Sequence, residues 1–401
     1  MTLTRREVLL LGVGALAAST GCADQSPDQP STTPTTSAPP VPSTSRTGSP
    51  APTWSQLANH VEGTLARPGS ATYDQVRLTE NPRYDGARPL AVLTVANAGD
   101  VATAFKFAQD HSLPVAIRSG GHSYPGWSAG ADRLVIDCRR LTGLQRFGNT
   151  ATIGAGSSLA SVYAALSDRG LAIAGGSCAT VGLGGLALGG GVGVLSRVWG
   201  LTCDSVTGLR VVTADGRVRR VDAGNDPDLL WALRGGGGGH LGVVTSLRMR
   251  AMPAISLRTF YLSWPISAAP QVIEAWQSWG PTSDARLWST LKVLGGAAHP
   301  AGPTIVVAGS WTGPGAPDLS GLLAHCPKPS THTTTPRTYA GAMRAYAGCS
   351  RIPLDRCHTG PGGDLVREAF SATSHVAYRE LPPAGISTLL DHVDRAAATG
   401  L

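Results

Sequence analysis

Two glycine-rich segments, each containing one chemically reactive side chain, constrain the fold and function of this chain more than any other feature of its sequence. His122 lies in Arg118-Ser-Gly-Gly-His-Ser123, and Cys178 lies in Gly175-Gly-Ser-Cys-Ala-Thr-Val-Gly-Leu-Gly-Gly185. Glycine lets the backbone approach a ligand closely. Successive small residues in a turn also present backbone N–H groups that bind anions such as a diphosphate. The two segments therefore predict a site where an imidazole and a thiol lie beside a phosphate-bearing ligand.

The composition is that of a globular protein with two ordinary domains. The chain has 401 residues, of which 42 % are hydrophobic, enough for a sizeable core. The net charge of +7 rests almost entirely on Arg residues that are scattered along the sequence, and aromatic residues make up only 5 %. Nucleic acid is therefore not an expected partner, because neither a clustered basic footprint nor a stacking surface is visible.

The N-terminal region predicts export rather than a fold. Residues 1–22 carry Arg5-Arg6 and then an apolar run to about Ser19, which is too short to span a bilayer and is typical of a twin-arginine signal. Ser19-Thr-Gly-Cys22 resembles a lipobox, so Cys22 is a candidate lipid anchor. Residues 23–53 are rich in Pro, Ser and Thr, which predicts a tether. We expect an exported protein, either tethered to the cell envelope or secreted in soluble form.

The other cysteines fit an oxidising compartment. Cys349 and Cys357 flank a short loop, and a disulfide between them is expected in an exported protein. A metal site made by this pair and His358 is the alternative, although no second ligand pair has a suitable spacing. We expect no metal.

Hydrophobic patterning predicts an α+β fold in two parts, 54–253 and 254–401. In the first part, Asp100 is a candidate helix cap and Ala214-Asp-Gly216 a hairpin turn. The predicted helices of the first part cover 54–65, 100–111, 158–169 and 226–233, and its strands cover 89–95, 113–118, 133–137, 150–154, 205–213, 217–221 and 241–249. In the second part a helix is predicted over 268–279, and strands over 256–264, 287–293 and 304–309.

One motif imitates a nicotinamide-dinucleotide fingerprint. Gly182-x-Gly184-x-x-Ala187 has the required spacing, and Asp204 follows at the usual distance. A true fingerprint needs a buried strand directly before it. The preceding residues, 175–180, are typical of a loop, so a nicotinamide-dependent enzyme is not expected.

Residues 54–253 resemble the FAD-binding domain of the berberine-bridge-enzyme-like oxidoreductases, in the vanillyl-alcohol-oxidase flavoprotein superfamily. The resemblance rests on five motifs in order, which are the His122 segment, Cys178-Ala-Thr-Val-Gly-Leu-Gly-Gly, Gly200-Leu-Thr-Cys-Asp-Ser, the Asp228 to Gly239 segment and Gly242-Val-Val-Thr245. It implies a two-subdomain FAD-binding domain of the PCMH type. Residues 254–401 are similar to the substrate domain of the family, which implies an antiparallel sheet with covering helices.

The resemblance implies FAD bound covalently, with His122 linked to the 8α carbon and Cys178 to ring carbon 6. Both side chains are nucleophiles, and two links would raise the reduction potential of the flavin and prevent its loss outside the cell. The predicted cofactor-binding residues are His122, Cys178, Arg118, Ser119, Gly120, Gly121, Ser123, Thr180, Val181, Gly182, Gly184, Gly185, Asp204, Val243 and Val244.

The activity implied by the resemblance is oxidation of a small-molecule substrate, a sugar or a secondary-metabolite alcohol. Hydride passes from the hydroxyl-bearing carbon to the flavin, and O₂ accepts the electrons. A dehydrogenase with another acceptor and an inactive flavin-binding remnant are the alternatives. In the family the catalytic base lies in a later segment rich in Tyr and Asn, which the sequence up to Leu401 does not include, so the base is unassigned. Tyr378 and Glu380 are the nearest local candidates.

Overall fold

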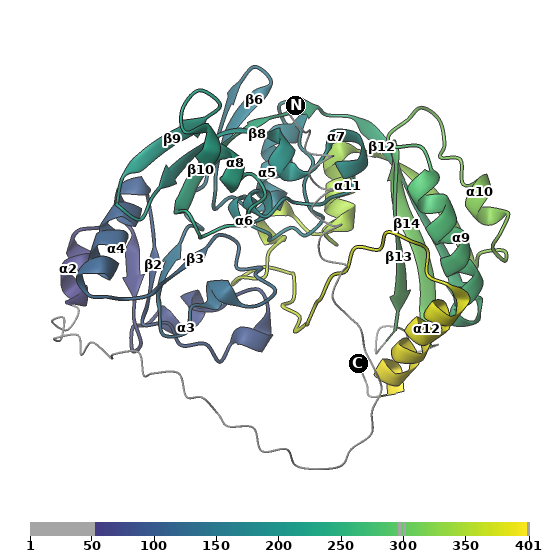
Figure 1. Ribbon diagram of the computed structural model, residues 1–401, viewed down its shortest axis with the longest axis horizontal. Helices are drawn as coiled ribbons and strands as arrows, with labels where there is room; N and C mark the ends of the chain where they lie inside the picture. The colour runs from purple at the N-terminus through teal and green to yellow at the C-terminus, as the bar shows by residue number, and fades with distance from the viewer. Residues whose placement is uncertain (1–52, 296–298, 300–301, 399–401) are drawn as a thin grey trace, which may run out of the picture. The chain divides into compact units, whose positions relative to one another are not determined.

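The computed structural model describes residues 53–295, 299 and 302–398, all within one compact unit. The predicted signal and the tether up to residue 52 lie outside the described residues. The described strands form four sheets, which are covered by helices (Figure 1). This arrangement confirms the predicted mixed fold class. No described sheet mixes strands from the two sides of residue 254, although the exact domain boundaries stay a prediction.

The first sheet leads directly into the His122 segment. Its strand order is β1-β2-β4-β3, with β2 and β3 parallel to β4 and β1 antiparallel to β2. The strands are β1 (Thr64–Ala66), β2 (Ala91–Thr94), β3 (Val115–Arg118) and β4 (Leu134–Asp137), and the helices of this region are α2 (Trp54–Asn59), α3 (Tyr73–Val76) and α4 (Ala98–Asp110). Fully buried Leu93, Leu134 and Ile136 pack in one core cluster with residues of α2 and α4. This core fixes the end of β3, after which the chain turns toward His122.

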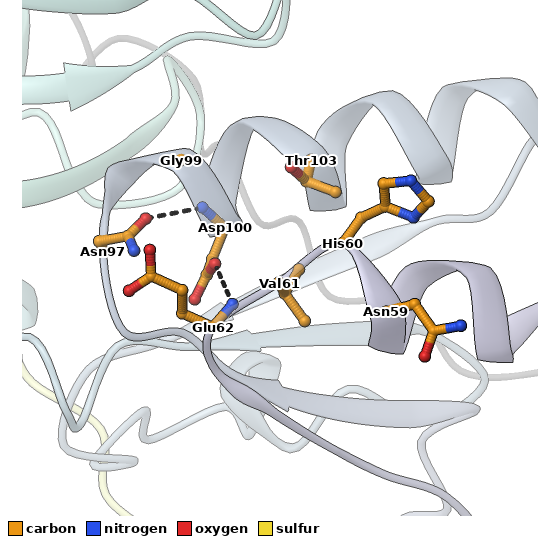
Figure 2. A pocket seen from close by; sticks show the side chains of 8 residues that line it. All are labelled: Asn59, His60, Val61, Glu62, Asn97, Gly99, Asp100 and Thr103. Carbon is orange, nitrogen blue, oxygen red and sulfur yellow. Dashed lines mark hydrogen bonds between the residues drawn. The ribbon is translucent and has the colours of Figure 1, made fainter.

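Two predictions for this region are wrong in detail. The helix predicted over 54–65 ends at Asn59, and residues 64–66 pair with β2 instead. Asp100 does not cap α4, because the side chain of Asn97 is the cap and accepts from the Asp100 amide. The Asp100 carboxylate instead accepts from the amides of residues 62, 63 and 96. Figure 2 shows this corner, a hollow of about 350 Å³ in which Asp100 is held by backbone donors.

The second sheet is antiparallel throughout, in the order β5-β6-β10-β8-β9. Its strands are β5 (Leu144–Phe147), β6 (Thr150–Gly154), β8 (Val206–Val212), β9 (Val218–Asp222) and β10 (Val243–Arg250). The predicted hairpin is confirmed, since β8 and β9 pair across the turn at residues 213–217. Around this sheet lie α5 (Leu159–Ser167), α6 (Leu183–Leu188), α7 (Ser196–Trp199), α8 (Pro227–Leu233) and a small pair of strands, β7 (Leu171–Ala172) and β11 (Met252–Pro253).

The third sheet belongs to the later part of the chain and is also antiparallel, in the order β13-β14-β12-β15. Its strands are β12 (Ser256–Pro265), β13 (Leu287–Leu294), β14 (Thr304–Trp311) and β15 (Thr331–Thr338). Helices α9 (Ala269–Thr282), α10 (Ser320–Leu323) and α12 (Pro383–Ala398) lie along this sheet (Figure 1). The patterning missed β15, whose Thr-rich sequence is largely exposed, so it shows no apolar alternation.

Helix α11 (Tyr339–Tyr346) joins the later part of the chain to the second sheet. The Tyr339 hydroxyl donates to the carbonyl oxygen of Ile173 at 2.9 Å, and its ring meets the edge of the Tyr163 ring on α5. Short 3₁₀ turns complete the described structure at Pro82–Tyr84, Trp127–Ala129, Thr202–Ser205, Ile266–Ala268 and Leu354–Arg356. The two parts of the chain therefore share a buried contact at Tyr163 and Ile173, which lie close to the segment that carries Cys178.

The predicted disulfide between Cys349 and Cys357 is confirmed, with Cα atoms 5.9 Å apart. The metal-site alternative with His358 is wrong, because the two sulfur atoms are bonded to each other. Among the described residues, the cysteines outside disulfides are Cys138, Cys178, Cys203 and Cys326. Within the same residues, no helix is long and apolar enough to cross a membrane.

Candidate flavin site

The two glycine-rich segments pack against each other, backbone to backbone. We call residues 119–123 the His122 loop and residues 177–182 the Cys178 loop. A Cβ atom on Gly120 would lie 2.2 Å from the amide nitrogen of Gly182, and a Cβ atom on Gly182 would lie 2.2 Å from the amide nitrogen of Gly120. Only glycine fits at either position. Gly121 also has a φ of +80°, which favours glycine. The loops that looked separate in the sequence thus form one feature.

One hydrogen bond links the reactive residues of the two loops. Nε2 of His122 lies 2.8 Å from Oγ1 of Thr180, two positions after Cys178. The same nitrogen lies 3.9 Å from a carboxylate oxygen of Glu80. Burial lowers the pKa of His122 below its ordinary value, and the Glu80 carboxylate acts in the opposite direction. The imidazole is therefore neutral at pH 7, which is the form that can act as a nucleophile.

Cys178 is exposed and its thiol is free. The loop around it is held from behind, because the buried hydroxyl of Tyr163 donates to the carbonyl oxygen of Gly176 at 2.6 Å. Ala179 is buried in a small cluster with the Cys349–Cys357 disulfide. An accessible thiol on a firmly held loop is suited to forming a covalent bond with a ligand.

The two loops also carry backbone donors that the described residues leave unpaired. Within residues 53–295, 299 and 302–398, no hydrogen bond uses the backbone N–H groups of residues 119–123 or 177–182. Gly121, Ala179 and Gly182 are buried residues, and buried N–H groups nearly always have an acceptor in folded proteins. A ligand with several anionic oxygens would satisfy these donors, so the loops fit the diphosphate of FAD.

The side chain of Arg118 has a structural role. It is only 1 % exposed, and it lies 3.4 Å from the fully buried carboxylate of Asp137. Its guanidinium also donates to three carbonyl oxygens in two segments, those of the adjacent Val76 and Arg77 and that of Ser128. Burial lowers its pKa to about 10, with Asp137 opposing the shift, so it stays protonated at neutral pH. Its predicted contact with a cofactor is restricted to its backbone.

The two serines of the His122 loop also bond within the protein. The Ser119 hydroxyl donates to the carbonyl oxygen of Ala155 at 2.7 Å, and the Ser123 hydroxyl accepts from the Trp127 amide at 3.1 Å. These bonds fix the loop, whose unpaired donors are its amides. The predicted roles of Ser119, Gly120, Gly121 and Ser123 therefore rest on backbone.

The remaining predicted residues differ in their burial and in their partners. Gly184 is buried and its amide donates to the carbonyl oxygen of Ala155, whereas Gly185 is exposed with open space around it. The carbonyl oxygen of Val181 accepts from Leu159, and the Asp204 carboxylate accepts from the Leu201 amide at 2.9 Å. Val243 and Val244 are buried in β10, in two different core clusters. Their contacts with a cofactor stay predictions.

The sequence analysis missed Glu80, which lies beside His122, and Thr359, which holds Glu80. Glu80 lies next to the imidazole, and both of its carboxylate oxygens are 2.9 Å from the hydroxyl of Thr359. Thr359 belongs to a segment, residues 358–370, that we call the strap. The two partners are 279 positions apart in sequence, so no local pattern could reveal this contact.

The candidates for a catalytic base lie elsewhere. Tyr378 is 69 % exposed, and Glu380 accepts a hydrogen bond from Ser278 of α9 at 2.8 Å. Neither has a hydrogen bond or ion pair with the His122 loop or the Cys178 loop in the described part of the chain. The base therefore stays unassigned. No group of three or more His, Cys, Asp or Glu residues that could hold a metal occurs among the described residues.

The dinucleotide fingerprint is a coincidence of spacing, as expected. The helix α6 that follows Gly182 is only six residues long, and the nearest preceding strand, β7, ends at Ala172. The intervening residues form the Cys178 loop rather than a buried strand, so the fold does not supply the βα turn that the fingerprint needs.

Comparison with known proteins indicates FAD binding in the region that contains both loops. Residues 89–222 match the family model described as FAD binding domain. The uncharacterised FAD-linked oxidoreductase YgaK of Bacillus subtilis (strain 168) is 37 % identical over 229 residues, which cover 53 % of this chain and 51 % of that protein. The chain thus spans about half the length of the curated relatives it matches.

Two solved structures cover most of this chain. The berberine-bridge-enzyme-like protein 1 of Physcomitrella patens superposes with a TM-score of 0.76 at 25 % identity, covering 86 % of this chain and 75 % of that one. A chitooligosaccharide oxidase superposes with a TM-score of 0.71 at 25 % identity, covering 86 % and 72 %. The resemblance and the fold class are confirmed, and FAD binding is supported for residues 89–222, whereas the predicted bounds of the domain, 54–253, stay a prediction.

Proposed function

We propose that this chain is a berberine-bridge-enzyme-like FAD-linked oxidoreductase and that it holds FAD covalently through both His122 and Cys178. The observation that carries the proposal is the contact between the two loops, in which the His122–Thr180 hydrogen bond joins the imidazole to the segment bearing the free thiol. FAD, when bound, supplies the redox chemistry by accepting a hydride. The protein supplies attachment, orientation and electrostatic tuning.

In this proposal the parts of the site have separate roles. The neutral imidazole of His122 and the exposed thiol of Cys178 are the attachment points. The unpaired amides of the His122 and Cys178 loops hold the diphosphate, because successive N–H donors in a turn form an anion-binding concavity. Arg118 stabilises the base of the His122 loop from the interior. Attachment through two residues on rigidly packed loops would keep the cofactor in place after export.

We propose a hydroxyl-bearing carbon of a sugar or a secondary-metabolite alcohol as the reacting group, with O₂ as the electron acceptor. The support is the solved neighbour that is a chitooligosaccharide oxidase. Measurement of peroxide formed per substrate oxidised tests the acceptor. Stoichiometric peroxide is expected, whereas substrate oxidation without peroxide would identify a dehydrogenase with another acceptor. A bound flavin that no alcohol or sugar reduces would indicate an inactive flavin-binding protein.

Peptide mass spectrometry of the acid-denatured protein tests covalent attachment. We expect one FAD to link the His122 and Cys178 peptides in the wild type. His122→Ala should leave flavin on the Cys178 peptide alone, and Cys178→Ala should leave it on the His122 peptide alone. Cys326→Ala is the matched control, since this partly exposed free cysteine lies in a different core cluster. Wild-type protein that releases all of its flavin on denaturation would contradict the proposal.

We also propose that the protein is exported by the twin-arginine route and anchored by a lipid on Cys22. The support is the sequence of residues 1–22. Cys22→Ala should move the protein from the membrane fraction to the soluble fraction, because a lipid chain buries apolar carbons in the bilayer. Cell fractionation and immunoblotting measure this, and Cys326→Ala should stay with the membrane. Unchanged membrane association of Cys22→Ala would argue against lipidation.

A further inference from the structure

The strap runs from the disulfide to residues 79–85, which lie beside the His122 loop in space because the Glu80 amide donates to the carbonyl oxygen of Gly121. Arg367 pairs through two nitrogens with the carboxylate of Asp85 and donates to the carbonyl oxygen of Thr79. Asn81 donates to the carbonyl oxygen of Phe370 at 2.8 Å. In Figure 1 the yellow-green chain that follows α11 reaches this region before it turns toward α12. Residues 79–85 are thus fastened from outside by a distant part of the chain.

Glu80 lies between residues that the strap contacts, and its carboxylate is 3.9 Å from Nε2 of His122. The hydroxyl of Thr359 bonds to both of its carboxylate oxygens, which fixes the rotation of the carboxylate. The Glu80 amide also donates to the carbonyl oxygen of Gly121, so backbone and side chain both connect it to the His122 loop. Its carboxylate is only 19 % exposed, so solvent screens its charge less than at the surface.

The geometry around His122 distinguishes its two ring nitrogens. Nε2 is the nitrogen that contacts Thr180 and lies 3.9 Å from the Glu80 carboxylate. A negative charge at this distance favours the tautomer with the proton on Nε2, since an N–H dipole pointing to it is stabilised. Nδ1 then carries the lone pair. The described hydrogen bonds of the His122 ring involve only Nε2, which leaves Nδ1 available for reaction.

We propose that Glu80, held by Thr359 of the strap, is a positioning residue that directs Nδ1 of His122 to form the flavin bond and stabilises the charge that arises on the imidazole. This inference rests on the proposed covalent attachment of FAD. A C–N bond forms between Nδ1 and the methyl carbon of the flavin ring, and one C–H bond and one N–H bond break. The two protons and two electrons pass to O₂, which becomes H₂O₂.

The role of the carboxylate follows from charge. When Nδ1 forms the new bond before the proton leaves Nε2, the ring becomes a cation, and a carboxylate 3.9 Å away stabilises it. Glu80→Gln keeps the size and most hydrogen bonds of the side chain but removes its charge. We therefore expect the rate of attachment to His122 to fall by at least about tenfold, because two opposite unit charges at this distance in a partly buried site attract by more than the equivalent of one order of magnitude in rate.

The experiment follows covalent attachment in the full chain after FAD is added, by quantifying FAD-bearing His122 and Cys178 peptides over time. Glu80→Gln should slow the His122 link and leave the Cys178 link at the wild-type rate. Thr359→Val should have the same, weaker effect, whereas Thr359→Ser, which keeps the hydroxyl, should restore the wild-type rate. Asp74→Asn is the control, because it removes an exposed carboxylate of the neighbouring helix α3.

The outcomes separate this inference from the proposed function. Wild-type rates on both peptides in Glu80→Gln and Thr359→Val would overturn it, and so would an equal loss of both links, since this would show a merely structural role. If Glu80→Gln does not fold, Thr359→Val and Thr359→Ser decide by the same selectivity. A wild-type protein without any flavin on His122 would overturn the proposed attachment itself.

Discussion

Gly120→Ala is expected to prevent the His122 and Cys178 loops from packing and to abolish covalent flavin attachment. The new Cβ atom would lie 2.2 Å from the amide nitrogen of Gly182 and 2.8 Å from the carbonyl oxygen of Thr180. Both are backbone atoms, so no side-chain rotation relieves the collision. The loops would have to separate, at a cost of about 1–3 kcal/mol or more in the free energy of unfolding.

The functional loss should exceed the loss of stability. Separation of the loops moves Thr180 away from His122 and disperses the unpaired amides that are proposed to bind the diphosphate. Urea unfolding measures the free energy, and peptide mass spectrometry measures attachment to both His122 and Cys178. We expect both links to be lost together, in contrast to the selective effect expected for Glu80→Gln.

Gly86→Ala provides the matched control for this substitution. Gly86 has no atom within 4 Å of an added Cβ and no positive φ, so alanine fits without strain. It should be neutral or stabilise the protein by about 0.4–1 kcal/mol through the unfolded state. If Gly120→Ala and Gly86→Ala behave alike, the close packing of the two loops does not matter for the fold or for the site.

The sequence predicted the parts of the site that depend on local chemistry. Glycine at positions 120 and 182 was recognisable because close approach of backbone needs it, and the structure shows that the approach is mutual. The β8–β9 hairpin was recognisable from its turn residues. The Cys349–Cys357 pair was recognisable because a short loop between two cysteines favours a disulfide in an exported protein.

Parts that depend on distant neighbours were not predictable. The apolar spacing of Trp54, Leu57, Val61 and Leu65 is helical, yet the chain leaves the helix at Asn59 because residues 64–66 find an edge on β2. The apolar periodicity indicates which side chains become buried. Pairing with another strand determines whether the backbone is helical or extended. The contacts between the strap and residues 79–85 also depend on distant neighbours. Neither segment carries a sequence motif that identifies the other, so these contacts could not be predicted.

Arg118 shows how burial changes the interpretation of a motif. An arginine directly before Ser-Gly-Gly-His is a reasonable candidate for an anionic ligand when only the sequence is known. In the structure its guanidinium faces the interior, where Asp137 and three carbonyl oxygens use its donors. Residue type predicted a charge near the site, whereas the direction of the side chain depends on the packing of β3 against β4.

Arg118→Met is accordingly expected to be strongly destabilising. The substitution keeps an apolar stem in the core but leaves the fully buried Asp137 with only its more exposed partner, Arg139, and removes the donors of three carbonyl oxygens. Breaking a buried ion pair by removing one partner costs about 3–5 kcal/mol. Urea unfolding should show a loss in this range, and attachment at His122 should fall with it, because Arg118 supports the start of that loop.

Arg217→Met is the control for Arg118→Met, because Arg217 pairs with Asp215 at 3.7 Å and its side chain is 78 % exposed. Exposed pairs contribute about 0–1 kcal/mol, so this variant should unfold almost like the wild type and attach flavin normally. A loss below about 1 kcal/mol for Arg118→Met, the range of an exposed pair, would mean that Arg139 alone satisfies Asp137.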